Sequence, residues 1–574
     1  MREGRPPGSR RRRLFYTAAA LACGVLWVAG TFAPPGPTLY VGGRILTMDA
    51  DNRIVDALAT EGERIAAVGG RAELEAWAEE RDARIVDLRG RTMIPGFVDG
   101  HSHFPGSGLL DPLVHLGSPP LGDVTDIDKL LSTLKDGADD SRRGDWIVGW
   151  GYDDTALAGG KHPARDELDR VSAEDPVVVF HISMHVAAVN SKGLEVLGFR
   201  EDSPDPEGGH LGRDAGGKLD GLLEEEAMRP VIAATLTPST LDGILAARAA
   251  AASYLAAGVT TAQNGAAQES HVRGLTKLSR FGLLPLRLVL WPEGEAAFAM
   301  LDGSLEVGET DPDWLRIGAS KLVADGSIQA YTGWFTKPYH VPPGDDPAWR
   351  GYPRIAHDEL VAQVARLHDA GRQVAVHGNG DAAIDDILDA FEAALAAHPR
   401  DDARHVIVHA QTARPDQLDR MKKLGVIPSF FELHTWYWGD RHRDRFLGPE
   451  RAARISPLRS AMDRGLRFTL HTDAPVVPME PMRVVAAAVT RRTASGAVLG
   501  ESERIDVMTA LRAVTIDAAW QMFMENSVGS LERGKFADLV ILDRSPLDDP
   551  DHIEDIRVVE TIVGGRSVAS RPPG

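Results

Sequence analysis

Four apolar, strand-like runs of this chain end at residues whose side chains can bind metal ions. These residues are His101 and His103 after residues 93–98, His377 after residues 374–376, His409 after residues 406–408, and Asp473 after residues 468–470. Imidazole nitrogen and carboxylate oxygen are ligands that Zn²⁺ accepts. Such ligands at the ends of separate buried strands predict a metal site assembled from distant parts of the sequence, which is typical of a hydrolase.

His101 and His103 are spaced for joint binding of one ion. Residues two apart on an extended strand point to the same face. For this motif alone, the alternative is a pair of loop histidines without a ligand role. The three further runs that end at a ligand type favour the metal site.

Asp473 is expected to have two roles. A catalytic zinc ion keeps one position for water and lowers the pKa of that water from 15.7 towards ~7. Asp473 would bind the ion, take a proton from the attacking water and pass it to the leaving nitrogen. His409 or a second cation would polarise the carbonyl group. The alternative is that Asp473 caps a turn before Pro475.

The composition narrows the class of protein. The formal net charge of −20 argues against a nucleic-acid partner, because nucleic acids are bound by basic surfaces. Cys23 is the only cysteine, so neither an intramolecular disulfide nor a zinc site made of cysteines is possible. Any metal must be held by His, Asp, Glu or a modified Lys.

The first 36 residues have the pattern of a signal peptide or membrane anchor. Residues 10–13 are arginines, and residues 14–33 form an apolar run followed by two prolines. A basic flank before an apolar stretch is typical of both kinds of segment, and this run is long enough for one membrane span. We expect an exported or membrane-anchored protein on the extracytoplasmic side: at the cell membrane, in the periplasm or extracellular. A segment without a role in export is the alternative.

The remaining chain has two kinds of region. Short strand patterns bounded by turn residues, typical of β-hairpins, lie at residues 39–43, 44–48, 65–70, 537–543 and 559–565. In the middle, amphipathic segments stop directly before apolar runs at Gly258, Gly371, Gly425 and Gly465. Glycine suits the left-handed conformation that ends a helix, so each case predicts a helix followed by a strand.

One β–α–β unit can be traced between His377 and His409. Residues 384–395 carry an apolar helical face between the two strands. Strands joined in this way are parallel and usually adjacent, which places both histidines at the C-terminal end of one sheet. In a (β/α)8 barrel this end holds the active site.

We therefore predict an α/β fold in three parts. Residues 97–499 form a (β/α)8 TIM-like barrel, and residues 37–96 and 500–574 together form a composite β-sandwich domain. The helix–strand rhythm is lost at about residues 111–235. This region is interpreted as an insertion that covers the barrel mouth, with a separate domain that has no role in the site as the alternative.

Longer motifs resemble a known family. They are residues 93–103, His377, His409-Ala410-Gln411, Asp473-Ala474-Pro475 and residues 529–540. In this order they resemble the amidohydrolase superfamily, and within it the amidohydrolase family 3 branch that contains N-substituted formamide deformylase. Residues 162–169, 189–192 and 324–327 extend the resemblance, which covers about residues 39–568.

The resemblance implies one or two divalent ions, with zinc as the first choice. His101, His103 and Asp473 would bind the first ion, and His377 and His409 would bind the second ion or the substrate carbonyl. Lys321 stands where the superfamily often has a lysine carboxylated by CO2, which would bridge two cations. The alternative for Lys321 is an ordinary lysine paired with Asp325.

The chain also departs from the family pattern at several positions. His471-Thr472-Asp473 replaces a more usual Gly-Ser-Asp, and Gln263 lies in a segment where an acid often ends a strand. His471 would be either a partner of a ligand or a plain structural residue. These changes leave the ligands intact and bear on the substrate.

Four aromatic or histidine residues are candidates for substrate binding: His185, Trp150, Tyr152 and His434. Aromatic rings would supply apolar contact, and histidines would orient polar groups. For each of them, a purely structural role is the alternative.

Together these features predict a metal-dependent amidohydrolase. It would use metal-activated water to cleave a C–N bond in a small amide, formamide or cyclic amide. The first alternative is an ester or lactone hydrolase that uses the same site. The second is a catalytically silent, membrane-tethered scaffold, which would be expected to have lost ligands. The identity of the substrate, the number of ions and the oligomeric state stay open.

Overall fold

The computed structural model describes residues 34–570. The predicted targeting segment therefore lies, up to residue 33, outside the described residues. Within residues 34–570, no single helix has both the length and the apolar character needed to cross a membrane. One pair of helices, Glu226–Thr235 and Thr240–Ala256, meets the test only when joined across a bend of 103°.

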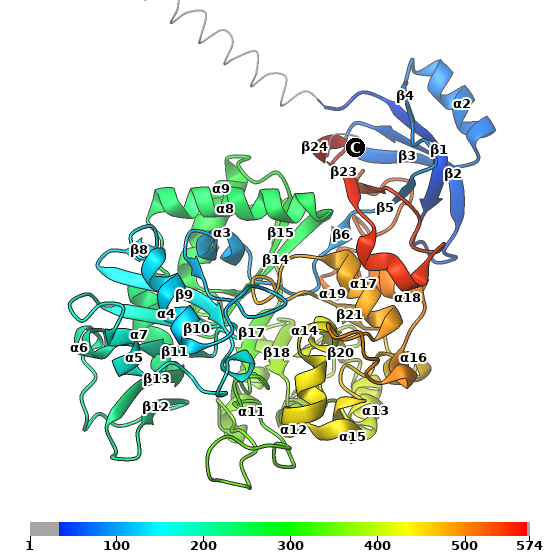
Figure 1. The fold of residues 1–574 in the computed structure, drawn as a ribbon. Coiled ribbons are helices and arrows are strands. Elements are labelled where there is room, and N and C mark those ends of the chain that lie inside the picture. The colour runs from blue at the N-terminus through cyan, green and yellow to red at the C-terminus, as the bar shows by residue number, and fades with distance from the viewer. Residues whose placement is uncertain (1–33, 571–574) are drawn as a thin grey trace, which may run out of the picture.

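Both ends of the described chain contribute to one eight-stranded sheet, where blue and red strands lie side by side in Figure 1. Its strands are β1 (Thr38–Leu46), β2 (Ile54–Glu61), β3 (Arg64–Gly69), β4 (Arg84–Asp87), β5 (Thr92–Pro95), β22 (Leu539–Leu542), β23 (Val558–Val563) and β24 (Arg566–Ser570). Antiparallel pairing of β22 with β5 joins the two ends. Helix α2 (Arg71–Glu80) contacts β1, β2 and β3.

The predicted strands at residues 39–43 and 44–48 are in fact one strand, β1, with an irregularity between Val41 and Ile45. Gly42 has a φ of +74°, which a residue with a side chain rarely adopts. A Cβ on Gly43 would lie 2.3 Å from the Arg91 carbonyl oxygen. The two glycines therefore form a β-bulge within one continuous strand. The sequence pattern had indicated a turn between two strands at this point.

Two parallel sheets carry the candidate ligands. The first has the order β16 (Leu315–Ile317), β15 (Arg287–Pro292), β14 (Val259–Ala267), β6 (Phe97–Val98). The second has the order β17 (Ser320–Val323), β18 (Val374–Gly378), β19 (Val406–His409), β20 (Ile427–Phe430), β21 (Thr469–Leu470). An isolated bridge from Glu293 to Lys321 links β15 to β17. Hydrogen bonds from Asp473 N to His101 O (3.2 Å) and from His103 N to Ala474 O (2.8 Å) link the segments that follow β21 and β6.

Helices connect these strands and cover them. They are α8 (Thr240–Ala256), α9 (Glu269–Arg280), α10 (Glu295–Leu301), α11 (His357–Asp369), α12 (Asp381–Ala397), α13 (Pro415–Leu424), α14 (Leu433–Arg441), α15 (Gly448–Ala452), α16 (Leu458–Asp463) and α17 (Pro481–Thr490). The four predicted helix-to-strand glycines all have positive φ, which confirms them. The predicted parallel pair is also confirmed, since Gly378 of β18 is opposite His409 of β19.

Two further helices lie in the range predicted for the terminal domain but pack elsewhere. They are α18 (Val507–Ala513) and α19 (Ile516–Gln521). Both contact β21, and α19 also contacts β6. Residues 507–521 therefore support the strands that carry His101 and Asp473.

Residues 106–235 contain a separate sheet, in cyan in Figure 1. Its strands are β7 (Val114–His115), β8 (Arg142–Arg143), β9 (Trp146–Tyr152), β10 (Val177–His181), β11 (Val186–Val189), β12 (Gly209–Arg213) and β13 (Leu219–Glu225), with helices α3 (Gly106–Leu110), α4 (Ile127–Asp136), α5 (Arg165–Asp169), α6 (Ser191–Leu197) and α7 (Arg229–Thr235). The sheet has apolar clusters of its own on both faces. Glycines lie within β9, β12 and β13 but not within β10 and β11, and none of these strands was predicted from the sequence.

A buried ion pair joins the terminal sheet to the first parallel sheet. Arg287, at the start of β15, donates to the Asp538 carboxylate through Nε (2.7 Å) and Nη2 (3.2 Å). Both side chains are almost fully buried. The guanidinium also lies 3.6 Å from the ring centre of Phe536, and Gly564 N donates to the carboxylate. This pair holds β22 against β15 and so fixes the base of the sheet that carries the site.

Replacing Arg287 by Met is predicted to destabilise the protein strongly, because Asp538 would be left charged and buried. Removing one partner of a buried pair costs about 3–5 kcal/mol, and denaturant unfolding measures this loss. The control is Arg44→Met, which breaks the half-exposed pair of Arg44 with Asp548 and should change stability little. Equal losses in both variants would contradict this role for Arg287.

Candidate metal centre

The structure brings the six predicted ligand residues together at the C-terminal ends of the parallel strands. His101 and His103 follow β6, Lys321 lies in β17, His377 lies in β18, His409 ends β19, and Asp473 follows β21. Five of them are nearly or fully buried, and the His103 side chain is 35% exposed. Parallel strands bring their C-terminal ends to one edge, so residues up to 372 positions apart become neighbours.

Two of the ligand residues are held in an unusual backbone conformation. His409 has a φ of +71°, and Asp473 has a φ of +58°. Such angles are uncommon for residues with side chains and cost of order 1–3 kcal/mol each. The surrounding fold must hold them, and the result is that both side chains turn into the site.

His101 presents Nε2 to the centre of the site. Its Nδ1 lies 2.8 Å from Gln263 Oε1, and Gln263 Nε2 donates to the Gly100 carbonyl oxygen at 3.2 Å. That second bond fixes which end of the amide is oxygen. Nδ1 of His101 therefore donates its hydrogen to Gln263, and Nε2 keeps its lone pair.

His377 presents the other ring nitrogen. Its Nε2 faces two acceptors, the Gly326 carbonyl oxygen at 3.2 Å and Asp325 Oδ1 at 3.6 Å. Asn379 Nδ2, 3.0 Å from the same nitrogen, donates to the Gly326 carbonyl oxygen. The hydrogen of His377 therefore belongs on Nε2, and the lone pair of Nδ1 points to His409 Nε2 at 3.1 Å.

Asp473 has an oxygen that the described residues leave without a hydrogen bond. Within residues 34–570 no donor satisfies buried Oδ1, although His103 Nε2 lies 3.1 Å away and His101 Nε2 lies 3.6 Å away. A buried carboxylate oxygen without a partner is costly. Lone pairs of His101 and Asp473 that converge in this way are suited to a cation.

The spacing of the ligand atoms supports this interpretation. Two atoms bound at 2.0–2.1 Å to a tetrahedral ion lie about 3.3 Å apart. The pairs His103–Asp473, His377–His409 and His101–Asp473 are 3.1, 3.1 and 3.6 Å apart. His101, His409 and Asp473 offer ligand atoms that all lie within 4.8 Å of one another. The residues present therefore fit one or two divalent ions.

The electrostatics keep His101, His377 and His409 neutral. Burial lowers the pKa of His101, His377 and His409 well below the usual value, and neighbouring histidines and Lys321 lower it further. Burial raises the pKa of Asp473, but the neighbouring His103, His471 and Lys321 outweigh burial and hold it below the usual value. Neutral imidazoles and an ionised carboxylate are the forms that bind metal.

Lys321 lies beside His101 and away from Asp325. Its Nζ is 3.3 Å from His101 Nε2, whereas Asp325 accepts backbone hydrogen bonds from Trp334, Asn379 and Gly380. Asp325 is thus bonded to backbone N–H groups. The pairing of Lys321 with Asp325, which the sequence left as the alternative, is not seen among the described residues. Burial lowers the pKa of Lys321 to about 8, against the opposing effect of Glu293 and Asp473.

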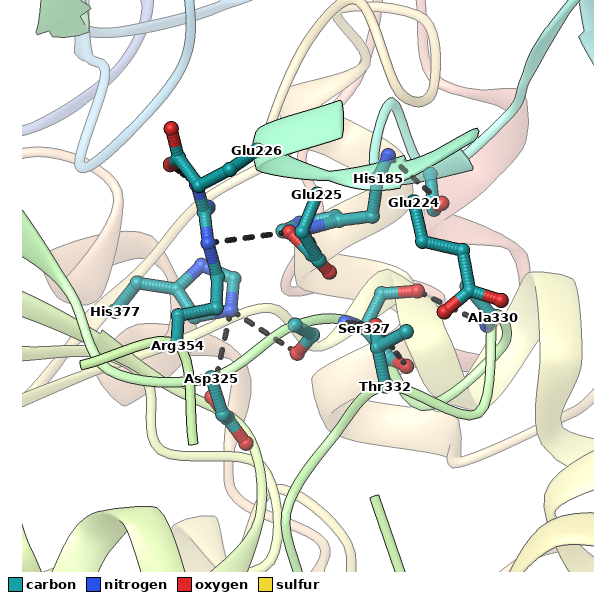
Figure 2. Close-up of polar contacts among 12 residues, drawn as sticks. His185, Glu224, Glu225, Glu226, Asp325, Ser327, Ala330, Thr332, Arg354 and His377 are labelled. Atoms are coloured by element: carbon teal, nitrogen blue, oxygen red, sulfur yellow. Dashed lines mark hydrogen bonds and ion pairs between the residues drawn. The ribbon is translucent and has the colours of Figure 1, made fainter. Parts of the chain in front are cut away.

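His185 is the predicted substrate residue that lies closest to the ligands. Its ring centre is 5.3 Å from that of His377, and its Nδ1 is bound by both carboxylate oxygens of Glu225 at 2.9 and 3.0 Å. Arg354 Nε lies 3.2 Å from the same carboxylate (Figure 2). Glu225 itself is buried at the end of β13 with a φ of +51°. The separate sheet of residues 106–235 thus delivers an oriented imidazole to the site.

The other three candidates lie differently. His434 packs on Phe431, with ring centres 4.4 Å apart, and Phe431 stands between it and His409. Tyr152 donates to or accepts from His162 Nδ1 at 3.0 Å and packs against His181. Trp150 packs against His115. Tyr152 belongs to an apolar cluster of the separate sheet, whereas Trp150 packs both on that sheet and against the main apolar cluster.

A second cluster of possible ligands is formed by Asp153, Asp154 and His181. Asp153 and His181 Nδ1 have hydrogen-bond partners, whereas Asp154 Oδ1 and His181 Nε2 have none within the described residues. Ser183 N donates to His181 Nδ1 at 3.1 Å, so the hydrogen of the neutral ring lies on Nε2, 3.3 Å from Asp154 Oδ1. Asp153 is bound by Trp438 Nε1 and Arg441 Nη1, both at 2.9 Å. His181 has no lone pair to offer at Nε2, which argues against an ion there.

Some residues of the site were not predicted from the sequence. Glu225 and Arg354 gave no signal beyond a run of three acids and a lone basic residue. Gln263 was noted only as a departure from a family pattern. Their roles depend on contacts across 40 to 162 positions, which no local pattern contains.

Comparisons with known proteins agree with this geometry. N-substituted formamide deformylase of Arthrobacter pascens is 28% identical over 537 residues, which cover 92% of this chain and 97% of that protein. The putative amidohydrolase YtcJ of Bacillus subtilis (strain 168) is 26% identical over 548 residues, 92% of this chain and 99% of that protein. A solved structure, an uncharacterized metal-dependent hydrolase from Pyrococcus horikoshii OT3, is 27% identical with a TM-score of 0.72, covering 90% of this chain and 99% of that one.

The α/β fold and the cluster of neutral imidazoles around a carboxylate define a metal-dependent hydrolase that uses divalent metal. The chain belongs to the amidohydrolase family, whose model matches residues 84–569. The family resemblance predicted from the sequence motifs is thereby confirmed.

His101→Ala is predicted to lose bound metal, because the substitution removes a buried lone pair that faces Asp473. Elemental analysis of the purified protein measures metal per chain. The control is His405→Ala, which also removes a buried imidazole. His405 directly precedes β19, whereas His409 ends it, so the control residue lies at the far end of the strand from the site. Equal metal content in His101→Ala and the unaltered protein would contradict the assigned site.

Proposed function

We propose that the protein hydrolyses a C–N bond in an N-substituted formamide or a related small amide. The observation that carries this proposal is the unpartnered Oδ1 of Asp473 beside the lone pair of His101. The full-length similarity to N-substituted formamide deformylase supports the substrate class. The retention of every predicted ligand supports an enzyme over a silent scaffold.

His101, His103 and Asp473 would hold the first ion, for which we propose zinc. When bound, such an ion lowers the pKa of water and withdraws electron density from a carbonyl group. Asp473 takes one proton from the attacking water and returns it to the nitrogen as the C–N bond breaks. Because one proton leaves the water and one reaches the amine, the step balances without a further reactant.

His377 and His409 would hold a second ion, bridged to the first by Lys321 in its carboxylated form. The pKa of about 8 supports this proposal, since the neutral amine is the form that reacts with CO2. A carbamate would place anionic oxygen among His101, His377 and His409, where a free ammonium group would repel cations. Loss of one of two ions in Lys321→Ala, by the same elemental analysis, would support the bridge, and an unchanged count would contradict it.

We also propose that the two parallel sheets form one (β/α)8 barrel, with β16 and β17 as two parts of one strand. The contacts that link the sheets at both edges support this architecture. The terminal sheet would be the composite β-sandwich domain, and the sheet at residues 106–235 would cover the barrel mouth through His185.

His185 gives a physical reason for a preference for amides. Because Nδ1 donates to Glu225, the lone pair of the ring lies at Nε2. A lone pair accepts the N–H of a secondary amide and finds no donor in an ester. We propose that this contact selects amides over the esters and lactones that the same centre could otherwise hydrolyse.

Turnover of an N-substituted formamide is predicted for the metal-loaded protein, with a loss of about 10²–10⁴-fold in Asp473→Asn, because Asn cannot carry the proton. Release of formate measures the reaction. Retained turnover in Asp473→Asn would contradict the role of Asp473. Absence of turnover in the unaltered, metal-loaded protein would contradict the substrate class.

His185→Ala is predicted to lower the ratio of amide to ester hydrolysis by about 10- to 100-fold, since one hydrogen bond of ~1–3 kcal/mol is lost. The kcat/KM values of a matched amide and ester pair give the ratio. The control is His210→Ala, an exposed imidazole on β12 of the same sheet. An equal loss for both substrates would show that His185 does not select the N–H group.

A further inference from the structure

Two glutamine side chains converge on one backbone oxygen, the carbonyl of Gly100. Gln263 Nε2 donates to it at 3.2 Å, and Gln521 Nε2 donates to it at 2.8 Å. A carbonyl oxygen only accepts hydrogen bonds, so both amide nitrogens must face it and both Oε1 atoms must face away. A Cβ on Gly100 would lie 2.8 Å from the Leu470 carbonyl oxygen, so this close arrangement requires glycine.

The orientation of Gln521 determines the hydrogen of Thr469. Thr469 Oγ1 lies 2.7 Å from Gln521 Oε1 and 2.8 Å from Ser429 Oγ. A hydroxyl group has one hydrogen to donate. Because the amide oxygen can only accept, Thr469 donates to Gln521, and Ser429 must donate to Thr469.

The hydrogen of Ser429 in turn determines the tautomer of His471. Ser429 Oγ lies 2.9 Å from His471 Nδ1. Since the hydroxyl hydrogen is already used, Ser429 accepts, and Nδ1 of His471 carries the ring hydrogen. His471 is buried, and burial favours the neutral form of an imidazole. With its one ring hydrogen on Nδ1, the ring has a lone pair at Nε2.

The series of hydrogen bonds ends at His409. Its Nδ1 lies 3.2 Å from His471 Nε2. Because His471 offers a lone pair there, the ring hydrogen of His409 must lie on Nδ1. The Nε2 of His409 then has a free lone pair, which faces His377 Nδ1 at 3.1 Å.

We infer that Gln521, Thr469, Ser429 and His471 form a hydrogen-bond relay that sets the tautomer of His409 for metal binding. The four are positioning residues, which act through His409 and do not touch the ion. The inference rests on the proposed metal centre. The carbonyl of Gly100 orients both glutamines. Through Gln521 it sets the tautomer of His409, and through Gln263 it sets the tautomer of His101.

The relay makes an unusual prediction for Thr469. In Thr469→Val, which keeps the shape of the side chain, Ser429 loses its acceptor and turns its hydrogen to His471 Nδ1. His471 then donates from Nε2, and the hydrogen of His409 moves to Nε2, where it opposes the ion. In Ser429→Ala the relay is only interrupted, and His409 is free to keep either tautomer.

The test measures the affinity of metal-free protein for Zn²⁺ alone, by competition with a chromogenic chelator. Thr469→Val should weaken binding by about 10- to 100-fold, the usual effect of losing a partner of a metal ligand. Ser429→Ala should weaken binding less, although Ser429 is closer to the ligands. Thr469→Ser keeps the hydroxyl group and should bind like the unaltered protein.

The outcomes separate this inference from the proposed function. Equal affinities in Thr469→Val and Thr469→Ser, or a larger effect of Ser429→Ala, would overturn the relay while the metal centre stands. Failure of the unaltered protein to bind Zn²⁺ would overturn the proposed function itself.

A second measurement needs no altered relay residue. Nitrogen-15 NMR of histidine-labelled, metal-free protein distinguishes protonated from unprotonated ring nitrogens, and comparison with His409→Ala assigns the signal of His409. A protonated Nδ1 is expected. A protonated Nε2 would overturn the inference.

Discussion

One constraint dominates the structure: a carboxylate oxygen of Asp473 is buried among imidazoles without a hydrogen-bond donor within the described residues. A neutral imidazole lone pair repels this oxygen, and a bound cation would make the arrangement favourable. The positive φ of Asp473 and His409 shows that the backbone is held in costly conformations to create it. The rest of the fold supplies the rigidity that this requires.

That rigidity comes from parts of the chain that are far apart in sequence. The terminal sheet joins both chain ends and is tied to β15 by the buried pair of Arg287 and Asp538. The sheet at residues 106–235 adds His185, oriented by Glu225 (Figure 2). The candidate ligands, their orientation and the placement of His185 therefore depend on four different sheets.

The histidine and aspartate ligands could be predicted from the sequence, because each follows an apolar run and strand ends in a parallel sheet meet at one edge. Lys321 was indicated only by the family resemblance. The pairing of β18 with β19 was predictable for the same reason. Trp150 and Tyr152 show the limit of such reasoning. Aromatic residues near histidines in sequence were candidates for the pocket, yet their rings pack on other histidines of the separate sheet.

The sequence by itself determined which side chains could bind metal and that strands would carry them, because hydrophobic periodicity and residue type are local properties. The tertiary structure alone decided which nitrogen of each imidazole faces the ion. His101 depends on Gln263, 162 positions away, and His409 depends on His471, 62 positions away. A tautomer is set by the donor or acceptor that the fold places beside the ring, and such partners leave no pattern along the chain.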